Sequence, residues 1–251
     1  MHGWHLKTPE EIELLRAVGK IVFGALEEIE KAVAPGITTA ELDRIGETYI
    51  RDRGAEPAFL GYQGFPASVC ISIDDEVVHG IPGSRRLVEG MIVSFDVGAK
   101  LDGYYGDSAR TVAVGEISPE DRRLIETTRE ALFKGIAQAR VGRRLYDISA
   151  AIQRHAELAQ YSVVRDLVGH GIGKSMHEEP QVPNYGIPGD GPELAEGLVI
   201  AIEPMINAGA GAVKWEADRW TVRTKDGSKS AHFEHTVAIT RDSPEILTTK
   251  G

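Results

Sequence analysis

Two aspartates interrupt a segment that otherwise reads as a β-hairpin, SFDVGAKLDGYYGDSART at positions 94–111. Aspartate is depleted in strands because its short side chain competes with the sheet for backbone donors. If the loop is centred on the Asp-Gly turn at 102–103, Asp96 lies opposite Ala109. If the loop is centred one residue earlier, Asp96 lies directly opposite Asp107. Either register places both carboxylates on one face, within reach of each other. Because the two anions would repel, we expect protons or a metal ion between them.

Further candidates for the same site lie in four other segments. His170 and His177 belong to VRDLVGHGIGKSMHEEP, whose glycines let the backbone approach a ligand closely. His79 precedes the turn-forming Gly-Ile-Pro of EVVHGIP. Glu203 follows the apolar run LVIAI, where an unpaired carboxylate would neutralise itself or destabilise the fold. Glu234 lies in AHFEHTVAI, a predicted strand.

The composition of this cluster is that of a divalent-metal site. Its expected ligands are four carboxylates and one imidazole, namely Asp96, Asp107, His170, Glu203 and Glu234. With a neutral histidine their charge is −4, which two divalent cations would neutralise. A donor set of oxygens with one nitrogen suits Mn, Fe, Co or Zn rather than a thiolate-type structural zinc. Two such ions about 3.5–4 Å apart form a device that several classes of hydrolase use to activate a shared water.

Two copies of one helix–helix–strand pattern are expected to position these residues. Thr8-Pro9 and Ser118-Pro119 each combine an N-cap hydroxyl, a proline at the first helical position and acids in the first turn. A second helix follows each of them, in TTAELDRIGETYIRDRG and LYDISAAIQRHAELAQ. The strands EGMIVSFDV and EGLVIAIEP begin at positions 89 and 196, so Asp96 of the first corresponds to Glu203 of the second. We interpret the near-constant offset as an internal duplication.

The alternation along both strands separates the acids from the core. Val93, Phe95 and Val97 share one face, and Asp96 lies on the other. We therefore predict a sheet covered by four helices, with the acids on the opposite face near a pseudo-twofold axis. No composition break or flexible linker divides the chain. The prediction is a single catalytic domain at 1–251, with halves at roughly 8–115 and 118–245.

The overall composition excludes several classes of protein. The 251 residues have a formal net charge of −10 and no basic run, which argues against nucleic-acid binding and against a polybasic membrane patch. No apolar run approaches the roughly 20 residues of a membrane span, and nothing resembles a signal peptide. The single cysteine, Cys70, cannot form an internal disulfide, so a reducing compartment is expected. We expect a cytoplasmic protein.

The chain resembles the type I methionine aminopeptidases along nearly its whole length. The motifs that carry the resemblance are TPEEIELLR, GYQGFPASVCISIDDEVVHGIP, DGYYGDSART, GHGIGKSMHEEPQVPNYG, AIEPMINAG and WTVRTKDGSKSAHFEHT. The resemblance implies an α+β, two-layer pita-bread fold with a curved, mostly antiparallel sheet. It also implies removal of the initiator methionine from nascent proteins whose second residue is small. The expected cofactors are two divalent metal ions (Co, Mn, Fe or Zn), and a monomer is expected, with ribosome contact left open.

Site roles follow from the same resemblance. Asp107 and Glu234 would bridge both metals, His170 and Glu203 would complete one site, and Asp96 would complete the other. Glu203 would accept a proton from the bridging water. His79 would contact the scissile amide, and His177 would stabilise the carbonyl oxygen. The methionine pocket would be formed by Tyr62, Phe65, Cys70, Met176 and Trp220. Family members often have tyrosine in place of Phe65 and an aromatic residue in place of Met176.

Three other interpretations fit parts of the sequence. GHGIGKS prompts a P-loop-like nucleotide binder, but a P-loop needs glycine where Val168 stands, five residues before Gly173. A prolidase- or aminopeptidase P-like peptidase shares the fold but ordinarily carries an additional N-terminal domain. A non-catalytic pita-bread binding protein is expected to have lost ligands, whereas all five are present here.

Overall fold

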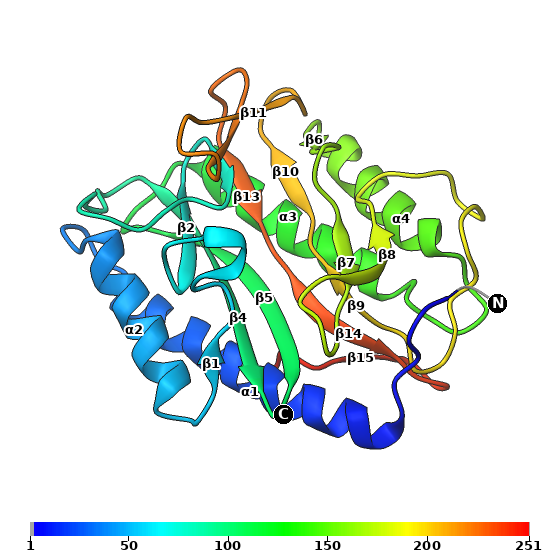
Figure 1. Ribbon diagram of the computed structural model, residues 1–251. Coiled ribbons are helices and arrows are strands. Elements are labelled where there is room, and N and C mark those ends of the chain that lie inside the picture. Colours follow the sequence, from blue (N-terminus) through cyan, green and yellow to red (C-terminus); the bar gives the residue numbers. More distant parts are fainter. Residues whose placement is uncertain (1–2, 251) are drawn as a thin grey trace.

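Four α-helices occur in the part of the chain that the computed structural model describes, residues 3–250 (Figure 1). They are α1 (Pro9–Ala32), α2 (Thr39–Arg51), α3 (Pro119–Ile136) and α4 (Leu145–Leu158). The predicted starts are confirmed: Thr8 Oγ1 accepts from Glu11 N at 3.3 Å, and Glu11 Oε2 accepts from Thr8 N at 3.0 Å. This reciprocal capping satisfies two backbone donors that the first turn of a helix leaves free. None of the described helices is long and apolar enough to span a membrane.

The predicted hairpin is formed by β4 (Ile92–Leu101) and β5 (Tyr104–Ala113), which pair antiparallel. Asp96 pairs with Ala109, and Gly98 pairs with Asp107. The Asp-Gly turn therefore sets the register, with both of its residues at positive φ (50° and 84°). The two aspartates are diagonal neighbours on one face. Strands β1 (Glu56–Pro57) and β2 (Val69–Ile73) pair with successive stretches of the other edge of β4.

A five-stranded antiparallel sheet carries the corresponding residues of the second half. Its order is β15 (Pro244–Ile246), β14 (His235–Ile239), β9 (Val199–Ile202), β7 (Gly169–Gly171) and β8 (Glu178–Val182). Two small sheets complete the fold. One contains β13 (Ser230–His232), β10 (Met205–Asn207) and β6 (Ser162–Val163), and the other contains β11 (Val213–Trp215), β12 (Val222–Thr224) and β3 (Glu76–Val78). A short 3-10 turn covers Tyr62–Gly64.

The segment AHFEHTVAI does not form the single strand that its alternation predicted. β13 ends at His232 and β14 begins at His235, so Phe233 and Glu234 lie in a break between them. The backbone of Glu234 instead pairs with β5: Glu234 N donates to Ala109 O at 2.8 Å, and Ala109 N donates to Glu234 O at 3.4 Å. This pairing across the middle of the molecule ties β5 to the second half at the level of the acidic residues.

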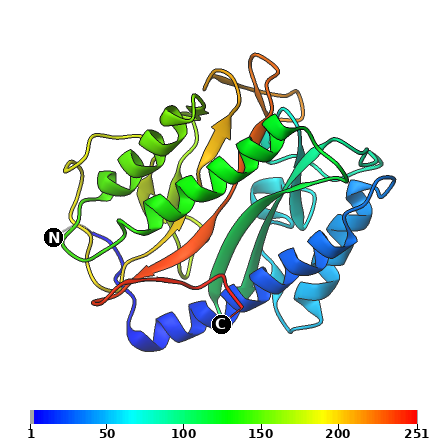
Figure 2. The same cartoon turned by 180° about the vertical axis from the view of Figure 1, so that it is seen from behind.

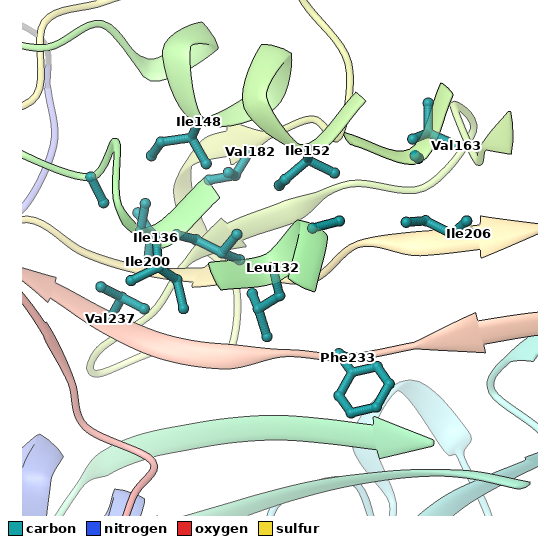
Figure 3. Close-up of a cluster of buried hydrophobic side chains, with 14 of the residues drawn as sticks. Leu132, Ile136, Ile148, Ile152, Val163, Val182, Ile200, Ile206, Phe233 and Val237 are labelled. Carbon is teal, nitrogen blue, oxygen red and sulfur yellow. The ribbon is translucent and has the colours of Figure 1, made fainter. Parts of the chain in front are cut away.

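The core is divided between the two pairs of helices. Helices α1 and α2 pack on β2 and β4, around buried side chains that include Val93, Phe95 and Val97. Helices α3 and α4 pack on the second half, and Figure 2, the view from behind, shows α1 and α3 in front of the central strands. In Figure 3, Leu132 and Ile136 of α3 and Ile148 and Ile152 of α4 lie over the strands that carry Ile200 and Val237. The helices therefore pack against the strands that carry or adjoin the acids.

Candidate metal centre

Five separate segments bring the predicted ligands together. Asp96 comes from β4, Asp107 from β5, His170 from β7, Glu203 from the residue after β9, and Glu234 from the break between β13 and β14. One ligand atom each of Asp107, His170 and Glu234 lies within 4.8 Å of the other two. Glu203 Oε1 lies 3.6 Å from His170 Nε2. The Asp96 carboxyl contacts that of Asp107, so all five candidates form one cluster.

The cluster is buried, and its electrostatics oppose the presence of four bare carboxylates. Asp107 and Glu234 are 4% and 2% exposed. Desolvation, followed by repulsion from the neighbouring carboxylates, holds the pKa values of Asp107, Glu203 and Glu234 well above the usual range. Desolvation also raises the pKa of Asp96 to about 7. The arrangement therefore calls for a positive charge at its centre.

Unpartnered donor atoms show that a cation fits there. Asp96 Oδ1, Asp107 Oδ1 and Glu234 Oε1 are buried without a hydrogen-bond partner among the described residues. The Nδ1 of His170 lies 2.8 Å from Gly171 O, to which it donates, and this fixes the lone pair on Nε2. That nitrogen faces Asp107 Oδ2 at 3.9 Å and Glu203 Oε1 at 3.6 Å. Buried oxygens with one imidazole nitrogen are a suitable donor set for a divalent metal.

The five candidate ligands line a cavity of about 360 Å³. Four of the five residues predicted for the methionine pocket line the same cavity: Tyr62, Phe65, Cys70 and Trp220. Phe65 packs edge-on against Trp220, with ring centroids 5.1 Å apart. Met176 is buried but is not among the lining residues. The apolar wall also includes residues that the sequence patterns did not single out, namely Phe59, Val78, Leu167, Val168 and Met205.

The two predicted catalytic histidines lie on the cavity wall. His79 has a left-handed backbone (φ 59°), and desolvation, with a smaller contribution from His177, lowers its pKa to about 4. A Cβ at Gly80 would lie 2.1 Å from Ile71 O, so the chain after His79 tolerates only glycine. His177 Nδ1 lies 2.8 Å from Tyr62 Oη, and burial lowers the pKa of this imidazole. Both histidines are therefore neutral at pH 7.

His232 is a buried neighbour of the cluster. Its Nε2 has no hydrogen-bond partner in the described residues and lies 3.7 Å from Glu203 Oε2. In the alternation of AHFEHTVAI, His232 lies two residues before Glu234 and therefore on the same side as it. Desolvation lowers the pKa of His232 to about 3, so it is neutral. It is therefore no counter-ion for the carboxylates.

Comparison with known proteins agrees with this geometry. Residues 13–241 match the metallopeptidase family M24. Methionine aminopeptidase 1 of Bacillus subtilis is 55% identical over 242 residues, which cover 96% of this chain and 98% of the relative. The crystal structure of methionine aminopeptidase from Rickettsia prowazekii superimposes with a TM-score of 0.97 at 44% identity, covering 98% of this chain and 99% of the other.

The prolidase from Pyrococcus furiosus shares the fold alone. It is 24% identical with a TM-score of 0.79, and the match covers 98% of this chain but only 66% of the prolidase. The much higher identity to the aminopeptidases separates the chain from this group. The predicted pita-bread architecture is confirmed by the superpositions. The chain belongs to the metallopeptidase family M24 and, within it, to the methionine aminopeptidases.

Proposed function

We propose that this chain is a metal-dependent aminopeptidase that releases an N-terminal methionine when the following residue is small. The observation that carries the proposal is one cavity with two chemically different sets of lining residues. The buried carboxylates and His170 form one set, and the apolar cluster of Phe65, Cys70 and Trp220 belongs to the other. A substrate that fills this space needs an apolar side chain close to a group that a metal can hold, which a peptide beginning with methionine provides.

We further propose that two divalent ions bind here, with Asp107 and Glu234 shared between them. Asp96 would complete one site, and His170 with Glu203 would complete the other. The unpartnered buried oxygens and the free lone pair of His170 support this assignment. When bound, such ions supply a Lewis acid that polarises the peptide carbonyl and acidifies a water.

The chain's own groups have separate tasks in the proposed reaction. Glu203, partly exposed to the cavity, accepts the proton of the attacking water. His177 donates from Nε2 to the carbonyl oxygen as negative charge develops on it. His79 contacts the scissile amide. The apolar wall holds the methionine side chain and excludes water from the reacting bond.

We propose one catalytic unit of two related halves, 8–115 and 118–245, acting as a cytoplasmic monomer on peptides and nascent-chain N-termini. The shared cavity supports the single unit, because Asp96 and Asp107 of one half and His170, Glu203 and Glu234 of the other line it together. Sedimentation equilibrium tests the monomer directly.

A peptide pair tests the activity. Metal-free protein reconstituted with Co, Mn, Fe or Zn should release methionine from Met-Ala-Ser and leave Ala-Met-Ser intact. The activity should disappear with chelator and return when the metal is restored. Ala-Pro serves as the probe for a prolidase-like activity. Hydrolysis of Ala-Pro without release of methionine from Met-Ala-Ser would contradict the proposed function.

A further inference from the structure

A lysine outside the metal centre is almost completely removed from solvent. Lys7 lies before α1, and its side chain is 1% exposed. Lysine is rarely buried without a partner. Its Nζ donates to Glu178 Oε2 at 2.6 Å, and Glu178 immediately follows His177 in the chain. The reaction proposed above uses neither member of this pair.

The turn that carries His177 closes around this lysine. Glu178 Oε1 accepts from Ser175 N at 3.2 Å, which ties the middle of the turn to its end. A Cβ at Gly173 would lie 2.6 Å from Lys7 Cε and 2.7 Å from Glu178 Oε1, so the start of the turn also lies against the pair. The turn therefore contacts the ion pair at its beginning, middle and end.

The lysine itself is fixed from the other side. Lys7 N donates to Gly197 O at 2.7 Å. A Cβ at Gly197, whose φ is 88°, would lie 2.7 Å from Lys7 O, so this approach requires glycine. The backbone of Lys7 is thereby held against the residues that precede β9. The segment before α1 therefore contacts two parts of the site. One is the stretch that leads into β9 and Glu203, and the other is the turn that carries His177.

The main effect expected of the Lys7–Glu178 ion pair is to fix the orientation of the residues that it joins. Because desolvation of two buried charges offsets most of their attraction, a buried ion pair contributes little net stability, but it can fix geometry. Of the residues in this turn, Met176 is buried, but the side chains of Lys174 and Ser175 are exposed, so packing holds the turn mainly through Met176. We propose that Lys7 and Glu178 are positioning residues that hold His177 in place for the aminopeptidase reaction proposed above.

A double-mutant cycle with His177 tests the proposal. Lys7→Met keeps the length and apolar stem of the side chain and removes the charge. Because a misplacement of about 1 Å can cost about 100-fold in rate, we expect kcat on Met-Ala-Ser to fall ten- to 100-fold, with KM changed less than about twofold. In a His177→Ala background, the same change should leave kcat unaltered, because the group being positioned is gone. A purely structural loss would lower kcat equally in both backgrounds.

A matched control lies in the same turn. Lys174 pairs with Glu11 at 3.1 Å, but its side chain is 60% exposed, and pairs of this kind contribute little. Lys174→Met should therefore keep the wild-type kcat. Metal content per chain should be equal in all variants.

Glu178→Gln is the second variant if Lys7→Met does not fold. It retains the shape and an acceptor for Ser175 N, and it should show the same loss that depends on His177. Equal losses in both backgrounds, an unchanged kcat, or failure of both variants to fold would overturn the positioning role. A wild-type protein that releases no methionine would instead overturn the proposed function, so the two failures are distinguishable.

Discussion

The hydroxyl of Tyr62 lies 2.8 Å from Nδ1 of His177. A neutral imidazole carries one N–H, and a hydroxyl that donates to Nδ1 leaves the ring proton on Nε2. Tyr62 therefore contributes more than an apolar wall to the cavity. When this hydroxyl donates to Nδ1, His177 carries its proton on Nε2 and is able to donate to a substrate oxygen.

Removal of this hydroxyl should slow turnover and leave the pocket intact. Tyr62→Phe retains the ring but loses one hydrogen bond, a contribution of about 1 kcal/mol, so we expect kcat to fall about fivefold. Steady-state kinetics on Met-Ala-Ser separate kcat from KM. Tyr161→Phe, a ring that packs against Arg123 outside the cavity, serves as the control. Equal kcat values for Tyr62→Phe and wild type would remove the hydroxyl from the mechanism.

Local patterns predicted the elements that position the site. The capping residues Thr8, Thr38 and Ser118 each accept a hydrogen bond from a first-turn amide, as their sequence signatures indicate. Of the two hairpin registers that the sequence left open, the Asp-Gly turn selected the one in which Asp96 faces Ala109. Period-two alternation is sufficient to place both aspartates on one face, because either register preserves side-chain parity.

Local sequence patterns could not predict the contacts between residues far apart in the chain. The break at Glu234 depends on its backbone pairing with Ala109, more than 100 residues earlier, and nothing in AHFEHTVAI itself encodes that partner. Lys7 likewise precedes a helix start in the sequence, and its burial follows from Glu178, 171 residues away. The sequence gives little indication of such a buried ion pair, because a single lysine beside a helix cap is typical of a solvent-exposed position.

Loss of a bridging carboxylate should remove metal and activity together. Asp107→Ala deletes the donor shared by both proposed ions, so metal bound per chain should fall and turnover should drop by several orders of magnitude. The fold should persist, because the metal-free cluster loses a source of repulsion. Metal analysis, circular dichroism and methionine release measure the three effects. Near-normal turnover at saturating metal would contradict the shared-ligand assignment.

The stability of the metal-free protein should depend on pH through Asp96. Folding raises the pKa of this carboxyl from 3.8 to about 7, so the folded state binds more protons than the unfolded state between these values. The contribution of Asp96 to stability is therefore present below about pH 4 and is lost as the pH rises toward 7. Melting temperatures in chelator at pH 4–8 are compared with those of Asp96→Asn. The buried histidines and the other three carboxylates titrate in both proteins, and the variant removes Asp96 together with its repulsion of those carboxylates. The wild type should lose stability relative to the variant as pH rises, and a constant difference would refute this dependence.

His177 should affect turnover more than binding. If it donates to the developing oxyanion, His177→Ala should lower kcat by roughly 10²–10³ with a smaller change in KM. Metal content should not change, because none of the predicted ligands is replaced. Activity and metal are measured on the same preparation, with His79→Ala as a second variant that should also slow turnover and retain metal. A change confined to KM would identify His177 as a ground-state binding residue.

The residue after methionine should be limited in size by His79. This side chain lies on the cavity wall, and its backbone cannot shift outward. Ile71 N donates to Gly80 O at 2.9 Å, Gly80 N donates to Ser72 Oγ at 3.1 Å, and Gly80 has no room for a Cβ.

A glycine, alanine or serine at the second position of the substrate fits beside the imidazole of His79, whereas a ring would displace the scissile amide. Because such a misplacement can cost about 100-fold, kcat/KM for Met-His-Gly should be at least about 100-fold below that for Met-Ala-Gly. His79→Ala opens this space and should narrow the ratio between the two peptides while lowering both rates. Equal cleavage of the two peptides by the wild-type protein would rule out the steric role of His79.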